Sequence, residues 1–104
     1  MSEPIQLYQV AYSERVRRRL AEMGAEAARR GDREAFAAAL KDFDGKLHLY
    51  PQFGDPLRDL VIERAALYNG IIRPLCMRNA VYENERLVVV VGIPVLMPMT
   101  RDGG

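Results

Sequence analysis

Residues 47–82 decide the fold, and this stretch reads LHLYPQFGDPLRDLVIERAALYNGIIRPLCMRNAVY. Pro51 ends a helix near the start of the stretch, because proline disfavours the helical backbone for the residue before it. An irregular connection follows, in which the apolar side chains of Phe53 and Leu57 are expected to act as anchors. Two strand-like runs come next, at residues 65–72 and 75–83. The stretch therefore predicts the end of a helical segment, followed by part of the sheet that this segment covers.

Two amphipathic helices are predicted before this stretch, at residues 14–30 and 33–48. In each helix, apolar residues recur at i, i+4, i+7 and i+11, which places them in one stripe. The stripe of the first helix is Val16, Leu20, Met23 and Ala27, and that of the second is Phe36, Leu40, Phe43 and Leu47. The link between the helices is short, so they are antiparallel neighbours that must pack on something else.

The ends of both helices carry cap signals. Ser13 stands at the N-cap of the first helix, where its hydroxyl can accept a hydrogen bond from a free backbone N–H. Gly31 is a C-terminal signal for that helix, and Asp32 is expected to cap the second one. Gly45 weakens the second helix by about 1 kcal/mol relative to alanine, which leaves an earlier end near Asp44 open.

The remaining strands follow from the period of the apolar residues. Residues 5–12 alternate and predict a short N-terminal strand, and residues 60–64 are expected to begin another one. Residues 87–93 are apolar on both faces, which is typical of a central strand covered on both sides. Residues 83–86 form the hairpin turn before it. The neighbours of this central strand are then the 75–83 strand and the N-terminal strand.

The sequence therefore predicts an α+β fold of order β-α-α-β-β-β, in which a helical hairpin packs on a small, mostly antiparallel sheet. On the 75–83 strand, Leu75, Met77, Asn79 and Val81 share one face, and Cys76, Arg78, Ala80 and Tyr82 share the other. The alternation sorts these residues into two sets that meet different surroundings.

The length and composition of the chain limit the class of protein. The 104 residues suffice for a single domain, 1–104, with residues 94–104 as a tail. One cysteine excludes an intrachain disulfide, and one histidine beside one cysteine argues against a metal site, so no cofactor is expected. No apolar run reaches the ~20 residues that span a bilayer, and no signal-peptide pattern is visible. A cytoplasmic protein without membrane contact is expected.

The order of elements resembles the RelE/ParE toxin superfamily of bacterial toxin–antitoxin systems. The connection at residues 51–60 is similar to the family's Pro-x-x-Gly-x-Pro-Leu-Arg segment. Residues 77–82, Met-Arg-Asn-Ala-Val-Tyr, look like its Tyr-Arg-x-x-Tyr element, with methionine in place of the first tyrosine. The valine-rich residues 87–91 follow a turn, as a strand does in that family. The resemblance extends over nearly the whole chain.

The resemblance implies a toxin that an antitoxin protein neutralises. ParE-type members bind and poison DNA gyrase, whereas RelE-type members cut messenger RNA on the ribosome with basic residues on the sheet and near the C-terminus. This chain has the apolar residues 92–99 in place of that basic segment, and its net charge is only +1, whereas RNA-binding proteins usually carry a basic excess. The sequence favours ParE-like protein binding, and it leaves open an endoribonuclease or a non-toxic relative that only binds a partner or dimerises.

Three arginines are candidate site residues. Arg78 matches the family's strand arginine, and Arg78, Arg73 and Arg58 would be catalytic if the chain were RelE-like. The alternative is structural, with Arg78 paired to a carboxylate at the sheet surface and the other two bonding backbone carbonyls. His48 is expected to bond a free carbonyl at its helix end, and Cys76 to act as a small apolar residue.

The apolar tail is the candidate partner-binding segment. Its residues Val95, Leu96, Met97 and Met99 form an extension that is interrupted by prolines. Exposed apolar patches usually mark an interface, so an antitoxin segment or a second copy of the chain is expected to cover it. The alternative is that the tail folds back over the sheet and completes the core.

Overall fold

The computed structural model describes residues 7–58 and 63–98. Its elements are, in order, β1 (Gln9–Ala11), α1 (Glu14–Arg29), α2 (Arg33–Leu49), the one-turn helix η1 (Pro51–Phe53), β2 (Asp55–Pro56), β3 (Ala66–Ile72), β4 (Leu75–Tyr82) and β5 (Leu87–Leu96). This is the predicted α+β fold, with η1 and β2 added after α2. Within the described residues, no helix is both long and apolar enough to cross a membrane.

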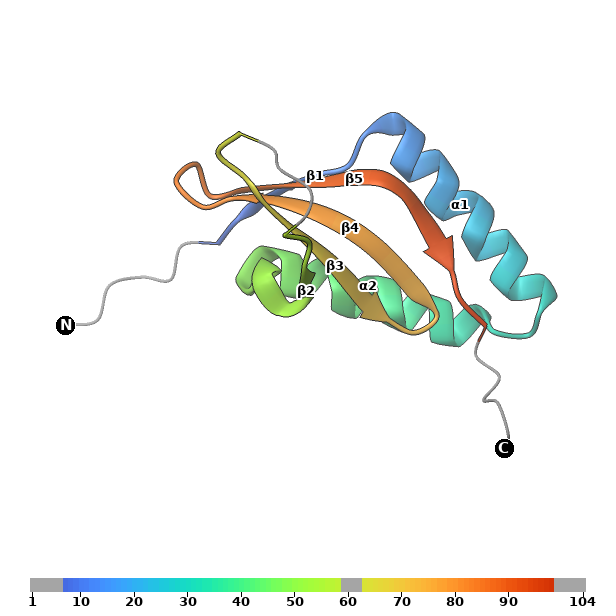
Figure 1. Ribbon diagram of the computed structural model, residues 1–104. Helices are drawn as coiled ribbons and strands as arrows, with labels where there is room; N and C mark the ends of the chain where they lie inside the picture. The colour runs from blue at the N-terminus through green and yellow to red at the C-terminus, as the bar shows by residue number, and fades with distance from the viewer. Residues whose placement is uncertain (1–6, 59–62, 99–104) are drawn as a thin grey trace.

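The strands form one sheet in the order β1-β5-β4-β3-β2, with β1 parallel to β5 and the other neighbours antiparallel (Figure 1). β5 lies between β4 and β1, as its apolar run predicts. β1 is shorter than predicted, and residues 5 and 6 of the predicted strand lie outside the described part. The sequence does not predict β2, because two residues are too few to show a period.

The structure describes only residues 63 and 64 of the short strand that was predicted to begin at residues 60–64. Residues 60–62 lie outside the described part of the chain. Glu63 and Arg64 lie in a turn, and Arg64 has a φ of 68°, which is outside the extended region of strands. The strand that follows begins only at Ala66.

The cap predictions hold at the first helix and fail in part at the second. The Ser13 hydroxyl accepts a hydrogen bond from the backbone N–H of Val16 at 3.1 Å. Gly31 ends α1 with a φ of 80°, the left-handed conformation that glycine adopts without strain. Asp32 stands at the N-cap of α2, but its side chain makes no capping hydrogen bond there. α2 does not end near Asp44, and it continues to Leu49.

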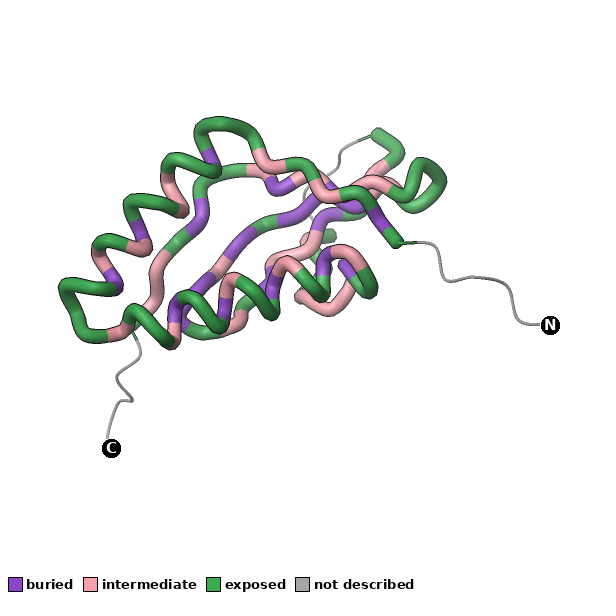
Figure 2. Tube along the Cα trace, turned by 180° about the vertical axis from the view of Figure 1, so that it is seen from behind, coloured by how far each residue is buried: buried purple, intermediate pink, exposed green. Residues whose placement is uncertain are grey.

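Both helices lie on the same face of the sheet, and the core fills the space between them and this inner face (Figures 1 and 2). Its large, fully buried side chains include Met23, Phe43, Leu47, Leu75, Met77, Val81 and Val88. Asn79 is the one buried polar side chain that the described residues place among them. The prediction that β5 is covered on both sides is therefore wrong. Val88 and Val90 are buried under the helices, whereas Val89 and Val91 face away from the helices and are partly exposed.

A close junction of α2, η1 and β3 fixes the connection after the second helix. The rings of Phe43 and Phe53 meet edge to face, with their centroids 5.1 Å apart. A Cβ at Gly70 on β3 would lie 2.6 Å from Phe43 Cζ and 2.9 Å from Phe53 Cζ. Glycine is therefore required at this point of β3, and the prediction that Phe53 anchors the connection is confirmed.

The replacement Gly70→Ala should lower the free energy of unfolding by about 1–3 kcal/mol, because the new methyl group forces both phenylalanine rings to move. The matched control is Gly45→Ala, where a Cβ meets nothing within 4 Å on an exposed helix position. It should raise the free energy of unfolding by about 1 kcal/mol. Urea unfolding of both variants measures these changes. If both replacements changed the free energy of unfolding equally, the close packing assigned to Gly70 would be contradicted.

Candidate functional site on the outer face of the sheet

The sheet has an outer face that points away from both helices (Figure 2). On β4, the outer side chains are Cys76, Arg78, Ala80 and Tyr82, and the inner ones are Leu75, Met77, Asn79 and Val81, which confirms the predicted division. In the register of the sheet, Asn69 of β3 and Val91 of β5 stand on either side of Arg78. Ile71 and Val95 flank Cys76 in the same way.

The outer face is apolar and is exposed mainly at one end. Leu67 and Ala80 are buried, whereas Ile71 is 45%, Ile93 51% and Val95 53% exposed. The exposed end lies at the turn between β3 and β4 and at the C-terminal half of β5. Contiguous apolar surface of this kind is costly in water and marks interaction sites in soluble proteins.

Arg78 is the charged residue at the centre of this surface. Its side chain is exposed, and it has neither an ion-pair partner nor a side-chain hydrogen bond within the described residues. The predicted structural role, pairing with a carboxylate at the sheet surface, therefore finds no partner in that part of the chain. A guanidinium carries five N–H donors in a fixed fork and suits a planar anion such as a carboxylate or a phosphate.

An irregularity of the β4–β5 ladder forms a hollow beside Arg78. The pairing passes from Arg78–Val91 to Cys76–Val95, so β5 uses more residues than β4 over this interval, and Gly92 takes a φ of 74°. The hollow has a volume of about 180 Å³ and is lined by Asn69, Cys76, Met77, Arg78, Val91, Gly92, Ile93 and Val95. The isolated glycine within an apolar strand is the sequence signal that could have predicted this bulge.

Two uncharged groups accompany Arg78 in the hollow. The Cys76 thiol donates a weak hydrogen bond to Asn69 Oδ1 over 3.6 Å. This contact occupies the oxygen of the Asn69 amide, while its NH2 group has no partner within the described residues and can serve as a donor. The sequence does not indicate a role for Asn69, because only the register of β3 against β4 brings it beside Arg78.

The structure does not bring the three predicted arginines together. Arg73 lies in the β3–β4 turn, where its Nη1 donates to the carbonyl of Pro98 at 3.2 Å. Arg58 follows Leu57, whose N–H bonds the carbonyl of Leu67 near the opposite end of β3. The seven residues of β3 span roughly 20 Å. Arg58 and Arg73 therefore lie at two ends of the sheet, and Arg78 lies between them.

The first three residues of the predicted tail, 94–96, belong to strand β5. Val95 and Leu96 belong to β5, Val95 pointing outward and Leu96 packing against the core. Met97 follows the strand, and its N–H donates to the carbonyl of Pro74 at 2.6 Å. Met99 lies outside the described residues. The apolar extension that was expected to begin at Pro94 is thus replaced, up to Leu96, by a continuation of the sheet.

A hydrogen-bonded cluster ties β1 to α2 on the helix side of the sheet. His48 Nδ1 lies 2.8 Å from the carbonyl oxygen of Tyr8, so the ring contacts a backbone carbonyl of the segment before β1 rather than the predicted carbonyl at its own helix end. His48 Nε2 also lies 3.5 Å from Asp44 Oδ2. The Tyr12 hydroxyl donates to Asp44 Oδ1 at 2.6 Å. The sequence gives no sign of the Tyr12–Asp44 bond, because the two residues are 32 positions apart.

The same cluster changes the acidity of one tyrosine. Burial, followed by the hydrogen bond to Asp44 and the negative charge of that carboxylate, raises the pKa of Tyr12 well above its ordinary value. Tyr12 therefore remains protonated and keeps donating to a higher pH than an ordinary tyrosine does. His48 and Tyr12 are both committed to structural contacts on the side of the sheet that is opposite to Arg78.

The outer face offers little acid–base chemistry. Tyr82 shares the face with Arg78, but it is four residues further along β4, or about 13 Å. Within the described residues, no cluster of histidine, cysteine, aspartate and glutamate could hold a metal ion. A general base must lie within hydrogen-bond reach of the proton it removes. Arg78 and the Asn69 amide, which line the same hollow, both offer N–H donors to an anion.

Comparison with protein-family models, with curated proteins and with solved structures gives no match.

The replacement Tyr12→Phe should lower the free energy of unfolding by about 1 kcal/mol at pH 7, because it removes the hydrogen bond to Asp44. The folded state holds the phenolic proton more tightly than the unfolded chain does. The contribution is therefore complete below the pKa of an unfolded tyrosine, near 10, and is lost as the pH rises above it.

Urea unfolding at pH 7 and at about pH 11 checks this prediction. The stability difference between the wild type and Tyr12→Phe should disappear at the higher pH. Tyr82→Phe is the control, since the Tyr82 hydroxyl makes no side-chain hydrogen bond within the described residues. A difference of the same size at both pH values would contradict the role assigned to Tyr12.

Proposed function

We propose that this chain is a toxin-like binding protein of the RelE/ParE type, whose outer sheet face is covered by a segment of a partner protein. The partner is an antitoxin that neutralises it, and the target is a protein, with DNA gyrase as the first candidate that the resemblance implies. Support for the fold part of this proposal comes from the β-α-α-β-β-β order and the mostly antiparallel sheet.

The observation that carries the proposal is the exposed guanidinium of Arg78, which has no ion-pair partner within residues 7–58 and 63–98 and lies in a partly exposed apolar surface. The side chains of Ile71, Ile93 and Val95 are about half exposed, and they offer an apolar surface that a partner can contact. A covered arginine requires an anionic partner, because an unpaired charge is costly to remove from water. The complementary segment is therefore apolar and carries one aspartate or glutamate that can form a bidentate pair with Arg78.

Two observations support binding over RNA cleavage. The described residues near Arg78 include no general base, and the three arginines are spread along the sheet rather than directed at one phosphate. Cleavage of a phosphodiester needs both a proton acceptor and stabilisation of the developing charge. The net charge of +1 also provides little attraction for a polyanion.

One observation favours the endoribonuclease as a second candidate. Arg78 and the Asn69 amide line the same small hollow, and together they could hold a single phosphate group. This second candidate also requires an anion site, and it differs from the first in cleaving RNA. The integrity of messenger RNA after expression of the protein distinguishes the two candidates.

Induced expression in a bacterium, with growth and RNA integrity followed together, tests the proposal. We expect growth arrest with intact RNA for the wild type, and relief of the arrest by Arg78→Ala, because the anchoring charge of the interface is lost. The control is Arg18→Ala, an exposed helix residue that is paired only with Glu14 at 3.2 Å. It should arrest growth as the wild type does.

The other outcomes contradict the proposal in distinguishable ways. Cut messages that depend on Arg78 would establish the endoribonuclease instead. Continued growth with folded, abundant protein would exclude a toxin. In that case, a dimer in size-exclusion chromatography that is lost in Ile93→Ser would show that a second copy covers the outer face.

A further inference from the structure

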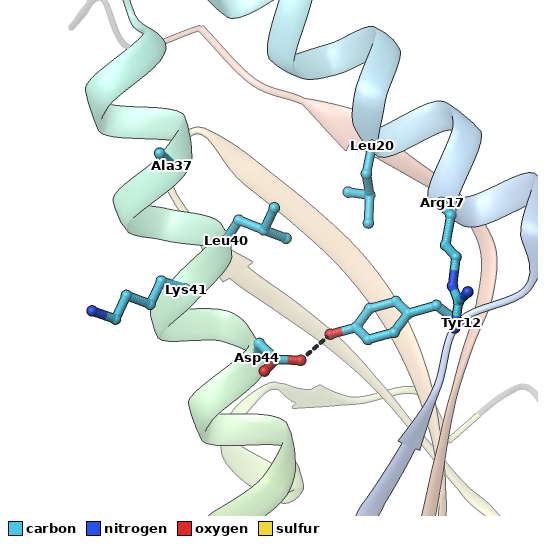
Figure 3. A pocket seen from close by; sticks show the side chains of 7 residues that line it. All are labelled: Tyr12, Arg17, Leu20, Ala37, Leu40, Lys41 and Asp44. Carbon is cyan, nitrogen blue, oxygen red and sulfur yellow. Dashed lines mark hydrogen bonds between the residues drawn. The ribbon is translucent and has the colours of Figure 1, made fainter.

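A second feature lies on the opposite side of the sheet, between α1 and α2. The two helices leave a hollow of about 450 Å³, which is lined by Tyr12, Arg17, Leu20, Ala37, Leu40, Lys41 and Asp44 (Figure 3). This volume is within the usual range for small-molecule sites in proteins, and such sites often occur between helices. The proposed function makes no use of this hollow, because Arg78 and the outer face lie beyond the sheet.

The hollow is open to solvent along its length, and contacts between the elements that line it limit it at both ends. Towards the turn between the helices, a Cβ at Gly24 of α1 would lie only 3.5 Å from the ring of Phe36 of α2, so the helices approach each other there. At the other end, the Tyr12–Asp44 hydrogen bond spans the gap between the helices (Figure 3). From Ala37 to Asp44, α2 advances by about 10 Å.

These limits favour a small molecule over a partner helix. A helix that binds in a groove lays several turns along it and uses anchors at i, i+3 or i+4, and i+7. Between the Gly24–Phe36 approach and the Tyr12–Asp44 bond there is space for one short apolar body.

The lining of the hollow combines an apolar floor with two basic residues, Arg17 and Lys41. Leu20 and Leu40 are half-buried and point into the space from the two helices (Figure 3). Arg17, near the start of α1, also lines the hollow and has no ion-pair partner within the described residues, unlike its neighbours Arg18 and Arg19. The carboxylate of Asp44 lies across the hollow and is engaged by the Tyr12 hydroxyl. Lys41 also lines the hollow, but its side chain extends away from it in Figure 3.

We propose that this hollow binds a small amphiphilic anion, with an apolar chain about 10 Å long on Leu20 and Leu40 and an acidic head on Arg17. The apolar chain removes the two leucine side chains from water, which drives binding. The guanidinium of Arg17 pairs with the head and selects an acid over a neutral molecule of the same shape. The ligand class is thus a medium-chain carboxylate.

Titration of the isotope-labelled protein with octanoate tests the proposal, with the methyl signals of Leu20 and Leu40 followed by NMR. The uncharged probe of the same chain is 1-octanol. We expect saturable shifts of both leucines with octanoate and binding of octanol that is about tenfold weaker, because a hydrogen bond to a charged group is lost.

Matched variants locate the site. Arg17→Ala should weaken octanoate binding about tenfold, and Arg18→Ala, at the next position and paired with Glu14, should leave it unchanged. Ala37→Phe should abolish binding by filling the hollow, whereas Ala38→Phe lies outside this lining and should not. All four positions are exposed, so these replacements are compatible with folding.

Three results would overturn the proposal. The first is the absence of saturable shifts at Leu20 and Leu40 in the folded wild type. The second is equal affinity for octanoate and octanol, which would remove the role of Arg17. The third is octanoate binding that Ala37→Phe leaves intact, since the ligand would then lie elsewhere. None of these results bears on Arg78 or on toxicity.

Discussion

The short turn between α1 and α2 is the constraint on which the rest of the structure depends. α1 ends at Arg29 and α2 begins at Arg33, and Gly31 provides the left-handed residue that reverses the chain between them. With so short a link, the second helix must return beside the first, on the same side of the sheet. The core forms under this pair, and within the described residues no helix covers the outer face of the sheet.

Side chains alternate between the two faces of β4, so the face under the helices and the outer face differ chemically. Neighbouring residues such as Arg78 and Asn79 are sent to opposite sides, the charge to the outer face and the amide into the core. The bulge at Gly92 then opens the outer surface beside Arg78, and the pairing of β3 with β4 adds Asn69. The two candidate sites, the outer hollow and the hollow between the helices, are separated by the sheet itself.

The segments on which the resemblance to RelE/ParE toxins depends have different roles in this fold. Residues 51–60 include η1 and β2, and Phe53 packs against Phe43 and Gly70, so part of this connection serves the core. Residues 77–82 form most of β4 and place Arg78 in the open. The second segment places a charged side chain without an ion-pair partner within the described residues on the outer face, and the proposed function therefore depends on it.

Local patterns in the sequence determined the two helices, the Ser13 cap, the strands β3 and β4 and the two faces of β4, because spacing and caps act between residues that are close in the chain. They also predicted that β5 is an interior strand of the sheet, between β4 and β1. They could not show that only one side of β5 is covered, or that Arg58 and Arg73 end up at opposite ends of β3 from each other. The Tyr12–Asp44 bond, the Asn69–Arg78 neighbourhood and the hollow between α1 and α2 were likewise decided by the tertiary structure. Each depends on residues from different elements, and their positions are set by packing over long distances in the chain rather than by local periodicity.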